Sequence, residues 1–151
     1  VSYYLRSSHD PLKGKILGNA EKLGEEEILA FTLTAVLGDG DADIAKVVIN
    51  GRVYDETVVK ITMASRRFNA WESLLERLKG MGFNCGKPIP VSDGVIDVRF
   101  HGSNAIELTR AMINALPLIL KDILDALAFD KWERIKRIAE VEVKFRLSEM
   151  Q

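Results

Sequence analysis

The string TLTAVLGDG at residues 32–40 ends a long, mainly apolar segment, which is preceded by three glutamates at residues 25–27. Negative charge in a first turn complements the helix dipole, and apolar residues recur at helical spacing behind it. Glycine ends helices, so the pattern predicts a helix over residues 25–37 that the two glycines of the string terminate. Asp39 then lies at the C-terminal end of that helix.

Two hairpins are predicted downstream of this helix. The pair Asn50-Gly51 is a strong hairpin turn, and Ser92-Asp93-Gly94 is a second turn. We expect strands at 45–50, 53–64, 87–91 and 95–101, and helices at 65–82, 103–116, 117–128 and 130 to about 145. This order predicts an α+β fold, an antiparallel four-stranded sheet with helices on one face.

The region before the first helix shows no clear period. It contains Asp10-Pro11 and Gly14, so we expect residues 1–23 to form an irregular arm or a short strand. The core unit is expected over residues 24–146, in one domain that takes up all 151 residues.

Composition narrows the class of protein. The chain is 47% hydrophobic and 28% charged, as in an ordinary globular domain. Cys85 is the one cysteine, so no intrachain disulfide is possible and nothing indicates secretion. The apolar runs are too short to span a bilayer, and residues 1–6 do not read as a signal peptide. We therefore expect a cytoplasmic protein with no membrane partner.

Net charge leaves two interpretations open. The value of −1 counts against a nucleic-acid binder and favours a small α+β interaction protein. The charge is unevenly distributed, however, because residues 21–27 hold four Glu and one Lys, whereas residues 60–87 hold six Lys or Arg against two Glu. A chain with a basic middle can still present a basic surface.

Alternation along two of the strands predicts a polar sheet face. In strands 53–64 and 95–101 the apolar residues face one side, and the other side carries Lys60, Thr62, Asp97, Arg99 and His101. Such a face is either solvated surface or a binding platform.

The alternating aspartates Asp39, Asp41 and Asp43 have the spacing of the first ligands in a calcium-binding loop. A calcium-binding EF-hand loop that starts at Asp39 would need glycine at its sixth position and a bidentate acid at its twelfth. The sequence has Ile44 and Asn50 there, which excludes this type of site.

A second interpretation concerns the end of the helix itself. An unpaired carboxylate at a helix C-terminus is disfavoured, and a divalent cation held by Asp39 with the carbonyl of Gly38 would remove the penalty. Ala30, Thr34 and Gly38 form a line of small residues along one helix face, which would let a second helix approach closely. The alternative is a buried helix that ends in a plain Gly-Asp-Gly turn.

Residues 32–40 resemble the nine-residue motif of the LAGLIDADG homing endonucleases in its variant ending Leu-Gly-Asp-Gly. Thr34 stands at the helix-packing glycine of the motif and Asp39 at its metal-binding acid. Leu37 replaces the other acid, and Thr32 and Leu33 replace the opening Leu and Ala. The family's order of elements covers residues 24–146, and residues 65–71 resemble the polar-basic run that leads to a tryptophan in its second helix.

The resemblance implies a site-specific double-strand DNA endonuclease of the single-motif, archaeal intron-encoded type, acting as a homodimer with Mg²⁺. Asp39 and Gly38 would hold the metal, and Ala30, Thr34 and Gly38 would form the dimer interface. Catalysis would also involve His101, in place of the family's Lys, and Ser65, in place of a common Gln. The expected DNA contacts are Arg52, Tyr54, Lys60, Thr62, Arg66, Arg67, Asp97 and Arg99. The alternative function is a non-cleaving nucleic-acid-binding relative or an intron RNA maturase.

Overall fold

The computed structural model describes residues 13–149 and the side chains of residues 13–141. Its four strands form one antiparallel sheet in the order β1-β2-β4-β3. The strands are β1 (Asp41–Ile49), β2 (Arg52–Ala64), β3 (Ile89–Ser92) and β4 (Val95–His101). The helices are η1 (Ala20–Lys22), α2 (Glu25–Leu37), η2 (Ser65–Arg67), α3 (Phe68–Gly80), α4 (Ser103–Ala115), α5 (Leu118–Leu127) and α6 (Asp130–Glu149). The predicted α+β fold is confirmed.

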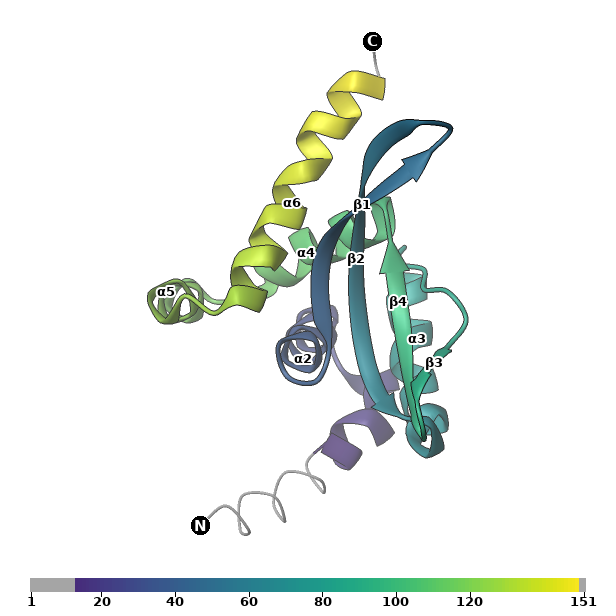
Figure 1. Cartoon of the computed structure of the whole chain (residues 1–151). Coiled ribbons are helices and arrows are strands. Elements are labelled where there is room, and N and C mark those ends of the chain that lie inside the picture. Colours follow the sequence, from purple (N-terminus) through teal and green to yellow (C-terminus); the bar gives the residue numbers. More distant parts are fainter. Residues whose placement is uncertain (1–12, 150–151) are drawn as a thin grey trace.

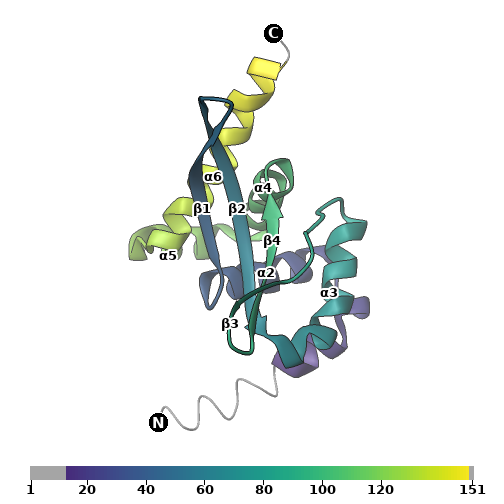
Figure 2. The same ribbon diagram turned by 45° about the vertical axis from the view of Figure 1, so that its right-hand side comes forward.

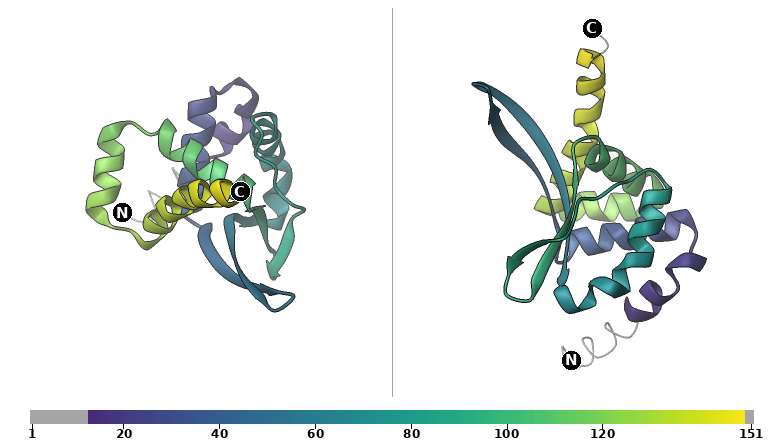
Figure 3. Two further views of the ribbon diagram at one scale, coloured as in Figure 1. Left: turned by 90° about the horizontal axis from the view of Figure 1, so that it is seen from above. Right: turned by 90° about the vertical axis from the view of Figure 1, so that its right-hand side faces the viewer.

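The layers are plain in the ribbon views. The curled sheet has its helices on one face and leaves the other face open (Figure 1; Figure 3, right). The turn of the β1–β2 hairpin and the end of α6 lie at the same end of the molecule, and α5 projects from the body (Figure 2). No helix within residues 13–149 is long and apolar enough to cross a membrane.

The first hairpin forms at the predicted turn, because Asn50 and Gly51 both adopt positive φ values of 52° and 79°. Two such residues make the turn whose twist matches that of the flanking strands. β1 begins at Asp41, four residues before the predicted start at Ala45. The aspartates have low strand propensity, but pairing with β2 recruits them, since Asp41 lies opposite Lys60.

The strand predicted at residues 87–91 is β3, displaced to Ile89–Ser92. Pro88 and Pro90 lack the N–H that a ladder needs, which suits a short strand at the edge of the sheet. The pairing with β4 shifts register between Pro90 and Ser92.

The prediction of an irregular arm or short strand before residue 24 is wrong for residues 13–23. Residues 13–18 are helical and η1 follows, with Leu17 and Ala20 buried. Arg77 of α3 donates to the carbonyl oxygens of Ala20 and Leu23 at 2.8 and 2.7 Å. This contact with α3, which is distant in sequence, accounts for the folded segment. The rest of the predicted arm, residues 1–12, lies outside the described residues.

The core lies between the sheet and helices α2, α3, α4 and α6. The sheet contributes Val59, Ile61, Met63, Ile96, Val98 and Phe100, and the helices contribute Ile28, Leu33, Trp71, Leu74, Leu78, Leu108, Met112, Trp132, Ile135 and Ile138. α2 packs against β1, β2, α3 and α4, so it is the central helix of the core.

Gly40 marks the point where the end of α2 meets the sheet. It is buried, and a Cβ atom there would collide with the carbonyl oxygen of Lys60 and lie 2.9 Å from the Cα of Val36. Those obstacles are backbone atoms of β2 and α2, which cannot rotate away. The last glycine of the TLTAVLGDG string therefore permits the helix and the strand to touch.

We predict that Gly40→Ala lowers the free energy of unfolding by about 3 kcal/mol or more, the upper range for overpacking a core. The control is Gly80→Ala at the end of α3, where an added Cβ meets nothing within 4 Å. That change should leave stability unchanged or raise it by about 0.5 kcal/mol, because alanine restricts the unfolded chain. Urea denaturation of both variants measures the difference, and equal midpoints would contradict the packing argument.

Candidate active site at the end of α2

Asp39 sits in a three-residue joint between α2 and β1. The N–H of Gly38 donates to the Thr34 carbonyl at 2.9 Å, and the N–H of Gly40 donates to the Ala35 carbonyl at 3.0 Å. The backbone on both sides of Asp39 is thus hydrogen-bonded to the last turns of α2. The carboxylate itself is exposed to solvent.

A hollow of about 550 Å³ runs along α2 beside this joint. Five residues that sequence reasoning placed in the site line it together, namely Ala30, Thr34, Gly38, Asp39 and Thr62. Phe31 and Trp71 also line it, with ring centroids 5.6 Å apart. The structure therefore brings the small-residue helix face and the acid to one open surface.

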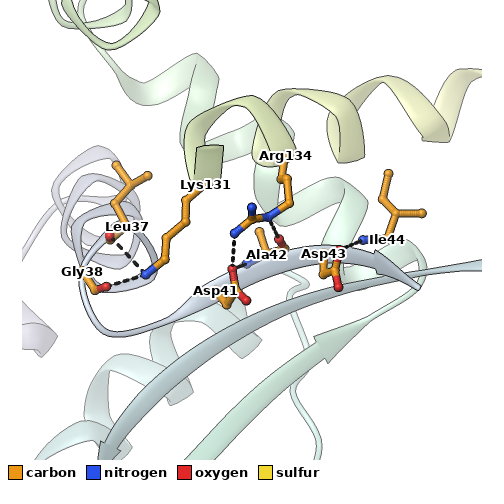
Figure 4. Close-up of polar contacts among 8 residues, drawn as sticks. All are labelled: Leu37, Gly38, Asp41, Ala42, Asp43, Ile44, Lys131 and Arg134. Atoms are coloured by element: carbon orange, nitrogen blue, oxygen red, sulfur yellow. Dashed lines mark hydrogen bonds and ion pairs between the residues drawn. The ribbon is translucent and has the colours of Figure 1, made fainter. Parts of the chain in front are cut away.

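Two cations of α6 hold the backbone on either side of Asp39 (Figure 4). Lys131 Nζ donates to the Gly38 carbonyl oxygen at 2.6 Å and lies 3.5 Å from that of Leu37. α2 has no basic residue in its own last turn. Lys131 therefore supplies the positive charge that a helix C-terminus favours.

Arg134 makes the second of these contacts. Its Nε donates to the Ala42 carbonyl at 2.7 Å, and its Nη2 donates to Asp41 Oδ1 at 2.7 Å. This caps part of the outer edge of β1, where backbone groups have no neighbouring strand. Partial burial acts to raise the pKa of Asp41, but the hydrogen bonds from Arg134 and the Ala42 N–H, with the charges of Arg134 and Lys60, hold that pKa below its usual value.

The polar face of the sheet forms as predicted. Lys60 lies opposite Arg99, and Thr62 lies opposite Asp97. Thr62 Oγ1 donates to Asp97 Oδ1 at 2.7 Å, and Arg99 Nη2 donates to Asp97 Oδ2 at 3.3 Å. Asp97 is only 5% exposed. Its carboxylate therefore orients Thr62 and Arg99 and presents little surface of its own.

His101 is not adjacent to the start of β1. It pairs with Val58, and Lys60, two residues along β2, pairs with Asp41. Standard strand spacing puts the Cα atoms of His101 and Asp41 roughly 12 Å apart. The Nδ1 of His101 is 3.1 Å from Glu56 Oε1, and both side chains are partly exposed.

The remaining predicted DNA contacts lie at the two ends of the sheet. Arg52 and Tyr54 are exposed beside the hairpin turn, at the far end of β2 from η2. Ser65, Arg66 and Arg67 are exposed in η2, and the Ser65 N–H donates to the Gly94 carbonyl at 2.9 Å. The predicted contacts thus extend along the whole length of β2.

The donor chemistry at Asp39 suits a hard cation. A carboxylate and a backbone carbonyl are oxygen ligands, and Mg²⁺ is commonly held by one or two carboxylates together with phosphate oxygens and waters. Within the described residues no group of three or more His, Cys, Asp or Glu could hold a metal ion. A metal held by Asp39 and a backbone carbonyl would complete its shell with waters, phosphate oxygens or groups of a second chain.

Sequence reasoning missed Lys131 and Arg134. Both belong to a charged helix, DKWERIKR at residues 130–137, in which four of the eight residues are basic. Spacing alone does not distinguish the two that reach the motif about 90 residues upstream. The one signal was the absence of a basic residue in the last turn of α2. The positive charge that favours a helix C-terminus therefore had to come from another element.

No protein-family model and no curated protein matches the chain. Solved structures of the homing endonuclease I-CvuI do match it. The structure with the I-CreI target in 2 mM Mg, its DNA not cleaved, superposes with a TM-score of 0.54 at 13% identity, over 75% of this chain and 64% of that one. The structure with its own target in 2 mM Ca gives a TM-score of 0.50 at 14% identity, over 78% and 71%. The chain has the homing endonuclease fold.

At such identities the likeness establishes the fold. In the first comparison the chain spans slightly less than two thirds of the I-CvuI chain. The order of elements that supported the resemblance to homing endonucleases is confirmed. The single-motif, homodimeric and archaeal details stay predictions.

The contact between Asp41 and Arg134 predicts a pH effect. Because the folded-state pKa of Asp41 lies below its ordinary value, the stabilisation is present above about pH 4 and is lost as the pH falls through the folded pKa. We expect Asp41→Asn to cost less than about 1 kcal/mol at pH 7, since the pair is partly exposed. The difference from the wild type should vanish in acid.

Thermal unfolding of both proteins between pH 2 and pH 7 measures this difference. The control is the substitution Asp43→Asn. In the wild type the carboxylate of Asp43 accepts a hydrogen bond from the Ile44 N–H at 2.8 Å. A difference for Asp41→Asn that persists unchanged at pH 2 would show that the charge on Asp41 is not what stabilises the contact.

Proposed function

We propose that this protein is a site-specific double-strand DNA endonuclease of the homing type, which acts as a homodimer with a divalent cation, Mg²⁺. One observation carries the proposal. In a chain with the homing endonuclease fold, Asp39 follows the C-terminus of the central helix α2. Its carboxylate is exposed, and the small-residue face of that helix is open to solvent. Both I-CvuI structures are complexes with a DNA target.

The surroundings of α2 support the proposed homodimer. The helix buries Ile28, Leu33 and Val36 against the core, yet its opposite face, with Ala30 and Thr34, lines the open hollow. A helix that is apolar on both sides is usually covered on both sides. Small residues allow two helices to approach closely, and a pair of α2 helices would bring two Asp39 carboxylates to the same place.

We predict that Thr34→Leu separates the two copies. Thr34 is exposed, so the larger side chain leaves the core intact but prevents close contact between helices. Sedimentation should then show a monomer for this variant and a dimer for the wild type. Asn114→Leu, which adds the same side chain at an exposed position of α4, should remain dimeric. A Thr34→Leu dimer would mean that the interface lies elsewhere.

DNA would lie along the open face of the sheet, because a β-ribbon fits the major groove and alternate side chains reach the base edges. The proposed contacts are Arg52, Tyr54, Lys60, Thr62, Arg66, Arg67, Asp97 and Arg99, with Asp97 acting through the two side chains that it orients. Carboxylates also stand on this face. Asp41 is paired with Arg134, and Glu56 lies beside His101.

The chemistry of cleavage is assigned to a few residues of this chain. Asp39 and the Gly38 carbonyl would hold the cation, which when bound supplies activation of water and stabilisation of the leaving oxygen. Glu56 can hold the Nδ1–H of His101, which leaves Nε2 to position or deprotonate a water. Ser65 follows Ala64, which pairs with Val95 at the opposite end of β4 from His101, so Ser65 would act at a separate point along the DNA and not on that water.

We predict that Asp39→Asn slows single-turnover cleavage by about 10²–10³-fold or more, the cost of removing one electrostatic stabiliser. Asp39 is exposed, so folding should be unchanged, and DNA binding in Ca²⁺ should persist. The substrate is an intronless copy of the gene that hosts this reading frame, and EDTA should stop cleavage. Normal cleavage by Asp39→Asn would refute the assignment.

A second candidate function is nucleic-acid binding without cleavage, including service as an intron RNA maturase. The observations that favour it are that a lysine already occupies the Gly38 carbonyl and that His101, paired with Glu56, stands in place of the family's Lys. Salt-sensitive DNA or RNA binding by a wild-type protein that never cuts would select this function.

A further inference from the structure

The contact between Lys131 and Gly38 joins the proposed site to α6. The Nζ–O distance of 2.6 Å is short even for a hydrogen bond assisted by charge. The same ammonium lies 3.5 Å from the Leu37 carbonyl. It therefore stands at the carbonyl that immediately precedes Asp39, on the partly negative end of α2.

The rest of α6 holds this ammonium in place. Arg134, three residues on and on the same side of the helix, is anchored to Ala42 and Asp41. Trp132 is 1% exposed, and its Nε1 donates to Asp125 at 2.8 Å. Ile135 is also fully buried. The contacts of Trp132, Arg134 and Ile135 thus fix the backbone of α6 at Lys131. Only the side chain of Lys131 is free to move its ammonium away from the Gly38 carbonyl.

We propose that Lys131 is a positioning residue that holds the Gly38 carbonyl in the cation-free protein and competes with a divalent cation for it. This rests on the proposed function in one respect, the assignment of Asp39 and Gly38 as ligands of that cation. A carbonyl oxygen has two lone pairs, so the competition arises from charge and not from space. An ammonium and a divalent cation on one oxygen repel each other strongly.

The competition has a consequence for the working protein. Lys131 keeps the Gly38 carbonyl oriented and the end of α2 neutralised until a cation arrives. It then raises the cation concentration needed to fill the site. The displaced ammonium remains on a long, partly exposed side chain, within reach of a phosphate that shares the cation.

Binding of Mn²⁺ to the full-length protein without DNA, followed by electron paramagnetic resonance, tests this proposal. Lys131→Met should lower the Mn²⁺ dissociation constant about fivefold or more by removing the repulsion. Lys131→Gln keeps a hydrogen-bond donor without the charge, so it should show the same gain while leaving the melting temperature closer to the wild type. Lys131→Arg should bind Mn²⁺ as the wild type does.

Two control variants complete the experiment. Lys136→Met removes the same charge from α6, at a residue engaged by Asp125 and Glu133, and should leave Mn²⁺ binding unchanged. Asp39→Asn should abolish binding in every background.

A lower melting temperature for Lys131→Met with unchanged Mn²⁺ affinity would overturn the proposal and leave Lys131 as a cap of α2. Absence of bound Mn²⁺ in the wild type and in both neutral variants would overturn it as well. Failure of the proposed function is recognised separately, because it appears as missing DNA binding or cleavage, whereas the Mn²⁺ measurement involves no DNA.

Discussion

The contact between the end of α2 and the backbone of β2 is the constraint on which the rest of the structure depends. Gly40 allows it, because any side chain there would meet the Lys60 carbonyl. The chain passes from helix to strand within three residues, so Asp39 lies close to the start of β1. Asp39 and Thr62 both line the hollow beside this contact. A packing requirement of the core thus sets the position of the proposed catalytic acid.

α6 completes this arrangement from the other end of the chain. Lys131 and Arg134 bind backbone carbonyls immediately before and shortly after Asp39, and Trp132 and Ile135 bury the helix that carries them. These contacts answer two physical demands. The C-terminus of α2 needs positive charge, and the exposed edge of β1 needs hydrogen-bond partners. As a result the Lys131 ammonium lies at the Gly38 carbonyl, which is also a proposed ligand of the metal ion.

The net charge of −1 does not describe how charges are arranged on the open face of the sheet. Carboxylates and cations are present there together, but three of the carboxylates are engaged, Asp97 by Arg99, Asp41 by Arg134 and Glu56 by His101. Pairing reduces their influence on an approaching phosphate. Arg52 and Arg66, at opposite ends of β2, are exposed. Paired acids in the middle with exposed cations toward both ends suit a long ligand lying along the strands.

The sequence by itself determined the order of elements from α2 onward, the turn at Asn50-Gly51 and the polar face of β2 and β4, and it singled out Asp39 as the candidate acid. These are local properties, set by periodicity, turn preference and helix charge. Only the tertiary structure decided the start of β1, the folding of residues 13–23 onto α3, and the cations of α6 that bind the backbone on either side of Asp39. Each of those depends on a partner at least 19 residues away along the chain, as in the pairing of Asp41 with Lys60. The local sequence pattern does not identify such a partner, because many residues of the chain have the same charge or polarity. Only the folded structure shows which of them makes the contact.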